Sequence, residues 1–522
     1  MEIHTGIISC LNNNQVVRVN IRHHQFLLFI VLIFTGCSDP VQITGKLGET
    51  PEIFPDYAGV TIPENIAPLH FKLEQNNYQA TCLLLESEGK KLEIKGRDGS
   101  FYIPAKGWKD LLRTAKGKKI EVTVCVKTEG KWFGFEPFSW HVAAEPVDPY
   151  IAYRLIDPGY ALWNEMGIYQ RDIGTFKQSA VVENKMTGGN CMNCHSFHNQ
   201  DPDKMLFHMR KTYAGTYLID GGAIEKLETK TNRTISALVY PSWHPSGKYI
   251  AFTVNDTRQA FHMNDPNRIE VFDMASDVVV YDIEKRELVT VSQLFSNQCF
   301  ETFPTFSPDG RTLFFCTADV QQFPDDFDQV KYSLCAISFD PEKRTFGTSV
   351  DTLYNAKNMN KSVSLPRVAP NGKFLLYTLS SYGNFFIWHK DADLYMVNLE
   401  TQEHYPLAEA NSDFAESYHS WSSNSSWIVF SSRRIDGLYT HSYFSHIDEH
   451  GKASKPFVLP QKDTDYYKNF TKSYNIPEFI KGKIRTSQQD IVNIARKGNA
   501  VQIEFAEEKK FPVTKSVENM AH

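Results

Sequence analysis

YPSWHPSGKYIAFTV (residues 240–254) is the stretch of sequence that decides the fold, because its pattern returns three times further along the chain. Each copy has an aromatic or apolar residue, a Pro-Asp-Gly-type turn, and then an apolar run that reads as a buried β-strand. The other three copies are FPTFSPDGRTLFFCT (303–317), LPRVAPNGKFLLYTL (365–379) and YHSWSSNSSWIVFSS (418–432).

Further strand-like runs lie between the copies, such as DVVVYDI (277–283) and DLYMVNL (393–399). One repeat therefore holds about four strands, which is the content of one propeller blade. Residues 194–209 fit the same template, since Ser196-Phe197-His198 matches Ser242-Trp243-His244, and they supply a fifth copy.

A sixth blade is expected from residues 146–186 together with the C-terminal run NAVQIEFAEE (499–508), which would close the ring. The repeats resemble those of TolB-like (WD40-like) β-propellers, so we expect an all-β chain with a six-bladed propeller over residues 188–480. Residues 481–522 are assigned to the closing strand and a tail.

The second informative stretch is GGNCMNCH (188–195), which reads C-x-x-C-H. At this spacing the thiols of Cys191 and Cys194 can attach one haem covalently, and His195 can ligate its iron. A redox dithiol, half of a zinc site and two structural thiols are the alternatives. A zinc site needs a second ligand pair, and none is evident at usable spacing. The motif is expected on a surface loop of the first blade.

The sixth ligand of the haem iron is not fixed by the sequence. The candidates at loop-compatible distance are Met186, Met205, His208 and Met209. A Met ligand would raise the reduction potential and a second His would lower it.

The N-terminal segment has the pattern of an export signal. Arg18 and Arg22 precede the apolar run FLLFIVLIF (26–34), which is too short to span a bilayer. The run ends in Phe-Thr-Gly-Cys at Cys37, which resembles a bacterial lipobox. We therefore expect residues 1–37 to be a lipoprotein signal peptide with Cys37 as the lipid anchor. The expected location is the periplasm or cell envelope, at the inner or the outer membrane.

The remaining segments complete the expected domain plan. Residues 38–60 read as a tether, and residues 61–145 carry short β-like runs with regular turns, as in an immunoglobulin-like β-sandwich. Residues 146–187 are assigned to a linker that covers the haem. The net charge is −6 and no basic stripe is present, so no nucleic-acid partner is expected.

The whole pattern is similar to bacterial lipoproteins labelled cytochrome c or cytochrome c biogenesis protein. That resemblance implies one covalent haem c, electron transfer and a redox or scaffold protein partner in the cell envelope. The alternatives are a propeller that binds a protein or peptide without redox chemistry, and a biogenesis factor. A serine hydrolase is not expected, because the chain has no G-x-S-x-G elbow. We therefore expect an electron carrier or a binding protein rather than an enzyme.

Overall fold

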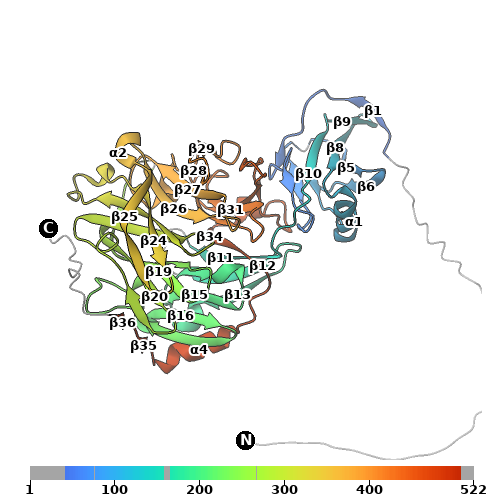
Figure 1. Cartoon of the computed structure of the whole chain (residues 1–522). Helices are drawn as coiled ribbons and strands as arrows, with labels where there is room; N and C mark the ends of the chain where they lie inside the picture. The colour runs from blue at the N-terminus through green and yellow to red at the C-terminus, as the bar shows by residue number, and fades with distance from the viewer. Residues whose placement is uncertain (1–40, 76, 158–164, 266, 507–522) are drawn as a thin grey trace, which may run out of the picture. The chain divides into compact units, whose positions relative to one another are not determined.

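The computed structural model describes residues 41–75, 77–157, 165–265 and 267–506, and most of them lie in β-sheets (Figure 1). The chain divides into two units, residues 1–42 and residues 43–522. The predicted signal peptide and Cys37 lie outside the described residues. Within the described residues, no helix is both long enough and apolar enough to cross a membrane.

The first part of the second unit is a small domain with two sheets and one helix. In the larger sheet the order is β1-β9-β8-β10-β3, with β5 also paired to β8 and β6 paired to β5, and in the smaller sheet it is β2-β4-β7. The strands are β1 (Ile43–Lys46), β2 (Ile53–Phe54), β3 (Thr61–Ile62), β4 (Phe71–Leu73), β5 (Ala80–Ser87), β6 (Lys90–Lys95), β7 (Ser100–Phe101), β8 (Lys119–Thr128), β9 (Lys131–Gly134) and β10 (Phe138–Val142).

Two details of this domain differ from the prediction. Strands β1 and β2 pair with β9 and β4, so residues 43–54 belong to the domain and are not a tether. Helix α1 (Ala105–Ala115) interrupts the expected run of strands. Its buried side chains, Trp108, Leu111, Leu112 and Ala115, recur at helical spacing and cover the core.

Residues 150–480 form a propeller-like series of antiparallel sheets, six of them in the described part of the chain. We number these sheets along the chain. The first holds β11 (Tyr150–Ile156), β12 (Met166–Asp172), β13 (Gln178–Glu183) and β34 (Ser473–Ile480); the second β14 (Met192–Phe197), β15 (Lys204–Met209), β16 (Gly215–Asp220) and β17 (Ala223–Glu228); the third β18 (Leu238–Trp243), β19 (Tyr249–Phe261), β20 (Ile269–Asp282) and β21 (Glu287–Val289).

The remaining three sheets repeat the same meander. The fourth holds β22 (Cys299–Phe306), β23 (Thr312–Asp319), β24 (Ser333–Asp340) and β25 (Thr345–Tyr354); the fifth β26 (Ser362–Val368), β27 (Phe374–Ser380), β28 (Asp393–Asn398) and β29 (His404–Pro406); the sixth β30 (Glu416–Trp421), β31 (Trp427–Ser432), β32 (His441–His446) and β33 (Phe457–Val458). Short helices lie between strands: α2 (Ala356–Met359), α3 (Tyr466–Asn469), α4 (Gln488–Lys497), η2 (Asn184–Thr187), η3 (His198–Gln200), η4 (Lys211–Tyr213), η5 (Phe327–Gln329) and η6 (Phe386–Trp388).

The predicted linker and the predicted closing strand are both wrong. Residues 146–187 hold β11, β12 and β13, and the strand that joins them from the C-terminal side is β34, not NAVQIEFAEE. That run forms β35 (Val501–Gln502) and β36 (Glu504–Phe505), which pair in parallel with the outer strands β17 and β21. The reason lies in SYNIPEFI (473–480), which carries the X-Pro pattern of the repeat, whereas NAVQIEFAEE does not.

One strand of each sheet carries the same bulge, and these six strands are called the inner strands: β14, β18, β22, β26, β30 and β34. Each contacts the next, and β34 contacts β14, so they form a closed ring. At each bulge one residue adopts a left-handed conformation, with φ between 47° and 54°; these residues are Cys194, Tyr240, Phe303, Leu365, Tyr418 and Ile476. Proline follows the bulge residue in four strands, and His195 and His419 follow it in the other two.

Candidate functional site

The C-x-x-C-H motif lies at the start of inner strand β14 and in its bulge. Cys191, Cys194 and His195 are all buried, with 2–4% of their surface exposed. The prediction of a surface loop is therefore wrong. The match of Ser196-Phe197-His198 to the other copies implies this position, because the residues before the match are the inner strand in every repeat.

The two thiols of the motif are free and lie in different surroundings. Cys191 packs in the apolar cluster of the first and second sheets, with Met166, Met192 and other side chains. Cys194 occupies the bulge, where its thiol bonds to the backbone of Tyr240 and burial raises its pKa. The Cys194 thiol is therefore not held as a reactive thiolate, because burial disfavours its charged form.

His195 is buried without a hydrogen-bond partner on either ring nitrogen. Burial, and then the positive charge of Arg154, lower the pKa of His195 to about 3, although the Ile476 backbone acts in the opposite direction, so the imidazole is neutral. The ring meets Phe197 edge-on at 6.0 Å between centroids. An unpaired buried imidazole costs free energy and is unusual in a folded protein.

His419 occupies the equivalent position in the sixth sheet and gives a direct comparison. Its Nδ1 lies 3.4 Å from Oγ1 of Thr378, and its Nε2 lies 3.1 Å from the backbone oxygen of Leu376. The position after the bulge therefore accepts a histidine with satisfied nitrogens. His195 has the same backbone setting and lacks those partners, a state that the buried His441 of the sixth sheet shares.

The four residues predicted as candidates for the sixth ligand of the haem iron lie in different parts of the structure. Met205 and Met209 belong to the same apolar cluster as Cys191, and Met186 lies in η2. The Nδ1 atom of His208 is hydrogen-bonded to the hydroxyl group of Thr216 at 2.8 Å, and its buried Nε2 has no partner. Its ring faces Phe252 of the third sheet, which places it on the other face of the second sheet from Met205 and Met209.

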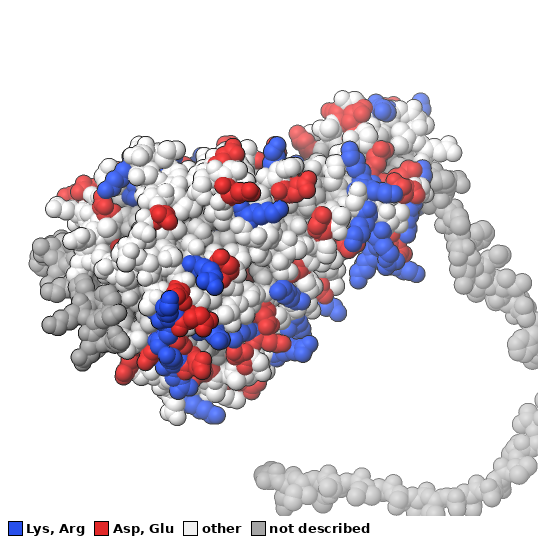
Figure 2. Space-filling view, viewed as in Figure 1, with Lys and Arg blue, Asp and Glu red and all other residues white. Residues whose placement is uncertain are grey.

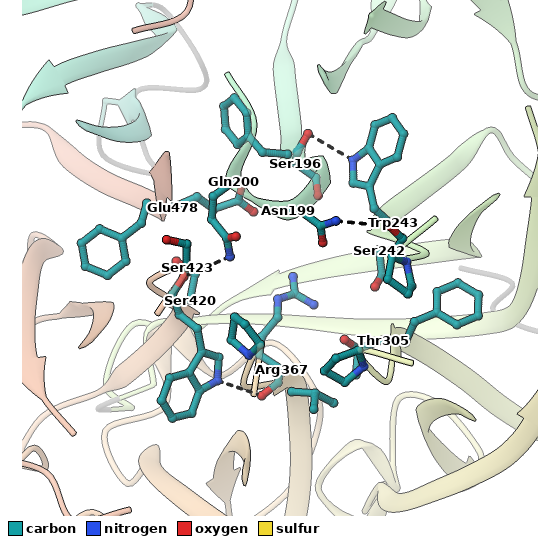
Figure 3. A pocket seen from close by; sticks show the side chains of 18 of the residues that line it. Ser196, Asn199, Gln200, Ser242, Trp243, Thr305, Arg367, Ser420, Ser423 and Glu478 are labelled. Atoms are coloured by element: carbon teal, nitrogen blue, oxygen red, sulfur yellow. Dashed lines mark hydrogen bonds between the residues drawn. The ribbon is translucent and has the colours of Figure 1, made fainter. Parts of the chain in front are cut away.

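A cavity of about 360 Å³ opens where the inner strands end, and we call it the axial cavity (Figure 3). Every inner strand contributes to it the residue two positions after its bulge. These six residues are Ser196, Ser242, Thr305, Arg367, Ser420 and Glu478. All six are polar, although they lie in strands that are otherwise largely apolar, and we call them the polar ring.

The hydroxyl groups of the polar ring are unused. Within the described residues, the side chains of Ser196, Ser242, Thr305 and Ser420 make no hydrogen bond to another protein group. The cavity therefore holds unpaired donors and acceptors from four different strands, a state that water or a ligand would satisfy.

The polar ring contains one cation and one acid. The guanidinium of Arg367 points into the centre of the ring in Figure 3, and its one hydrogen bond to protein is a long contact of 3.4 Å to the Pro366 carbonyl. Burial raises the pKa of Glu478 to about 8, although the charge of Arg367 and the Phe197 backbone act in the opposite direction. Glu478 is thus mostly protonated at neutral pH, and burial lowers the pKa of Arg367, opposed by the charges of Glu478 and Cys194.

Apolar side chains accompany the polar ring, because the next residue in each inner strand is apolar and also lines the cavity. The indole nitrogens of Trp243 and Trp421 donate to the backbone oxygens of Ser196 and Arg367, at 3.4 and 3.0 Å. Each bond joins an inner strand to its neighbour in the ring. The polar ring is therefore held by fixed β-strands rather than by loops.

The other end of the ring of strands is filled by aromatic side chains. The rings of Tyr240 and Phe303 lie 4.5 Å apart, and Phe385 contacts both Tyr240 and Tyr418. The long hairpin β19–β20 reaches this end, where Glu270 bonds to His389 Nε2 at 2.9 Å.

The axial cavity was not predicted from the sequence. The signal was present: two positions after the X-Pro or X-His pair of each repeat stands Ser, Ser, Thr, Arg, Ser or Glu. No cluster of three or more His, Cys, Asp or Glu side chains among the described residues is arranged to hold a metal ion. On the face shown in Figure 2, acidic and basic side chains are interspersed.

No protein-family model matches the chain, and no curated protein is similar to it. Solved structures with a similar arrangement include a DUF4784 family protein from Bacteroides caccae, at 8% identity and a TM-score of 0.28 over 69% of this chain and 95% of that one. They also include prolyl oligopeptidase B from Galerina marginata, at 10% identity and a TM-score of 0.32 over 68% of this chain. The match spans about half of that enzyme, 50% of its chain.

Proposed function

We propose that this chain is a cell-envelope β-propeller with six blades whose axial cavity binds a ligand or the end of a partner protein. The polar ring carries this proposal, because six successive strands place hydroxyl, guanidinium and carboxyl groups around one cavity and leave most of them without protein partners. Sites of this kind, concave and lined by a few convergent polar groups on an apolar frame, are the usual places for small ligands.

The rest of the chain gives this propeller its place in the cell. The export signal and Cys37 support a lipid-anchored protein of the periplasm or cell envelope, at either membrane. The small domain of residues 43–142 serves as an immunoglobulin-like spacer or interaction module. Closure of the ring by β34 beside β11 supports six blades, as in TolB-like propellers.

Native mass spectrometry of protein purified from the cell envelope tests the binding function. Ser242→Trp fills the cavity, and Ser292→Trp adds the same side chain at an exposed position outside it. We expect a non-covalent adduct on the wild type and on Ser292→Trp, and none on Ser242→Trp. An adduct that survives in Ser242→Trp, or no adduct in any form when extracts of the envelope are added back, contradicts the proposal.

A second function, that of a monohaem c-type cytochrome, is favoured by a separate observation. His195 is a buried imidazole with two unpaired nitrogens, next to two free thiols at C-x-x-C-H spacing. This donor set fits haem c, which Cys191 and Cys194 would hold by thioether bonds and His195 by its iron, and the group would supply a one-electron couple. Attachment of haem at these residues would require Phe197 and the neighbouring first sheet to move, since they pack against His195.

A pyridine haemochrome spectrum of denatured protein, made in a periplasm with the haem-attachment machinery, tests the cytochrome function. We expect an α-band of a haem with two thioether links, lost in the double variant Cys191→Ala, Cys194→Ala. His419→Ala is the matched control for His195→Ala, since both change the residue after a bulge. If wild-type protein has no covalent haem, the cytochrome proposal fails and the binding function stands alone.

A further inference from the structure

We propose that the axial cavity recognises a carboxylate group, presented by a small organic acid or by the C-terminus of a peptide, with Arg367 as its ionic partner. This inference rests on the proposed binding function and names the ligand chemistry of the same site. It follows from the charges, the unpaired donors and the size of the cavity.

A cationic side chain lies at the centre of the cavity. Arg367 is the cation of the polar ring, and its guanidinium faces the cavity with almost all of its N–H groups unused by protein (Figure 3). An arginine carries five donors in a fixed planar fork that matches a carboxylate in a bidentate pair. The side chain of Arg367 is half-buried and makes little contact with protein acceptors, so an anionic ligand would replace hydration that the guanidinium has partly lost.

Glu478 supplies an uncharged acid to the same cavity. Its carboxyl group lies in the same ring, and burial keeps it mostly protonated at neutral pH. A protonated carboxyl donates one hydrogen bond, so Glu478 is a donor to a bound anion rather than a competitor for Arg367. When Glu478 ionises, its charge repels a second carboxylate in the same ring. Binding is therefore expected to weaken at alkaline pH.

The size and shape of the cavity suit a small anionic group. Four hydroxyl groups surround the position that the guanidinium reaches, and each can donate to a carboxylate oxygen. A volume of about 360 Å³ is at the lower end of ligand cavities, which suits a small acid or the last residues of a chain. Arg367, Lys481 and the carboxyl group of Glu478 all line the cavity, so phosphate is the competing anion that the test must separate from a carboxylate.

Isothermal titration calorimetry at pH 7 with defined probes tests the proposal. The probes are lactate, the peptide N-acetyl-Ala-Ala-Ala with a free C-terminus, the same peptide with an amidated C-terminus, and inorganic phosphate. We expect lactate or the free-acid peptide to bind at least tenfold more tightly than the amide and phosphate. Which of the two binds more tightly distinguishes a metabolite from a peptide end.

Variants test whether the carboxylate probe binds in the axial cavity. Arg367→Gln is expected to weaken the carboxylate probe at least tenfold, whereas Arg311→Gln, at an exposed turn position outside the cavity, leaves it unchanged. Wild-type affinity is expected to fall about tenfold per pH unit above pH 8. Glu478→Gln keeps the neutral-pH affinity and removes that fall, because an amide side chain does not ionise.

The outcomes separate this inference from the function on which it rests. Equal binding of the amide and the free acid, tighter binding of phosphate, or an unchanged affinity in Arg367→Gln overturns the carboxylate inference. Binding of the amide that is lost in Ser242→Trp would leave the axial cavity a binding site of different chemistry. If no probe binds at 10 mM and envelope extracts give no adduct either, both proposals fail.

Discussion

Glu478→Gln is expected to stabilise the protein at pH 8 and to leave its stability unchanged near pH 4. Burial in the axial cavity raises the pKa of Glu478 from 4.5 to about 8 in the folded state. Between these values the unfolded chain releases a proton that the folded chain keeps, so the free energy of unfolding falls as the pH rises. At 1.36 kcal/mol per pH unit, the free energy of unfolding falls by at most about 5 kcal/mol across this interval. Because water enters the cavity and screens the charge of Glu478, we expect a fall of about 2 kcal/mol.

The assay is urea denaturation of the wild type and Glu478→Gln at pH 4, 5, 6, 7 and 8, with Glu284→Gln as the control at an exposed turn position. The difference between Glu478→Gln and the wild type is expected to grow through this range and to level off above pH 8. The Glu284→Gln difference stays flat. A difference for Glu478→Gln that is constant with pH would refute the reasoning, because it would mean that Glu478 ionises alike in the folded and unfolded chains.

Two further predictions concern other parts of the molecule. Cys82 and Cys125 face each other across β5 and β8, so in an oxidising compartment they are expected to form a disulfide worth about 2–4 kcal/mol; both thiols alkylated by iodoacetamide in denatured, unreduced protein would exclude it. The buried pair of Glu270 and His389 ties hairpin β19–β20 to the fifth sheet, so Glu270→Ala is expected to cost about 1–3 kcal/mol. Hydrogen exchange in the far half of the hairpin is the measurement, and protection unchanged there would contradict this role.

The repeats made the sheets of residues 188–480 predictable from sequence, because each copy carries a turn between two apolar runs. The first sheet was not assigned correctly, because its strands come from both sides of the repeats and only Ile476-Pro477 marks its inner strand. Helix α1 was missed for a different reason. Its apolar residues recur at helical spacing, but the run is short and strand-like segments flank it on both sides.

The site was predictable in part. The sequence singled out Cys191, Cys194 and His195, and the structure places them in one inner strand, but their burial depends on the neighbouring sheets. The axial cavity could not be found by any local motif, because Arg367 and Glu478 are more than a hundred residues apart and meet only when the ring of strands closes. Aligning the copies by their X-Pro or X-His pairs would have shown that the residue two positions after each bulge is polar in every copy.

The position that follows each bulge shows how a repeat can carry a function. Proline at four copies fixes the backbone and needs no partner for a side chain. His419 replaces it and is fully bonded, so histidine here is compatible with a purely structural role. His195 replaces it without partners, beside two cysteines that no other copy has at these positions. Since the backbone setting is the same in all copies, a comparison of His195→Ala with His419→Ala separates a ligand-binding role from a structural one. If His195→Ala costs no stability while His419→Ala costs about 1–3 kcal/mol, His195 is retained for a ligand and not for the fold.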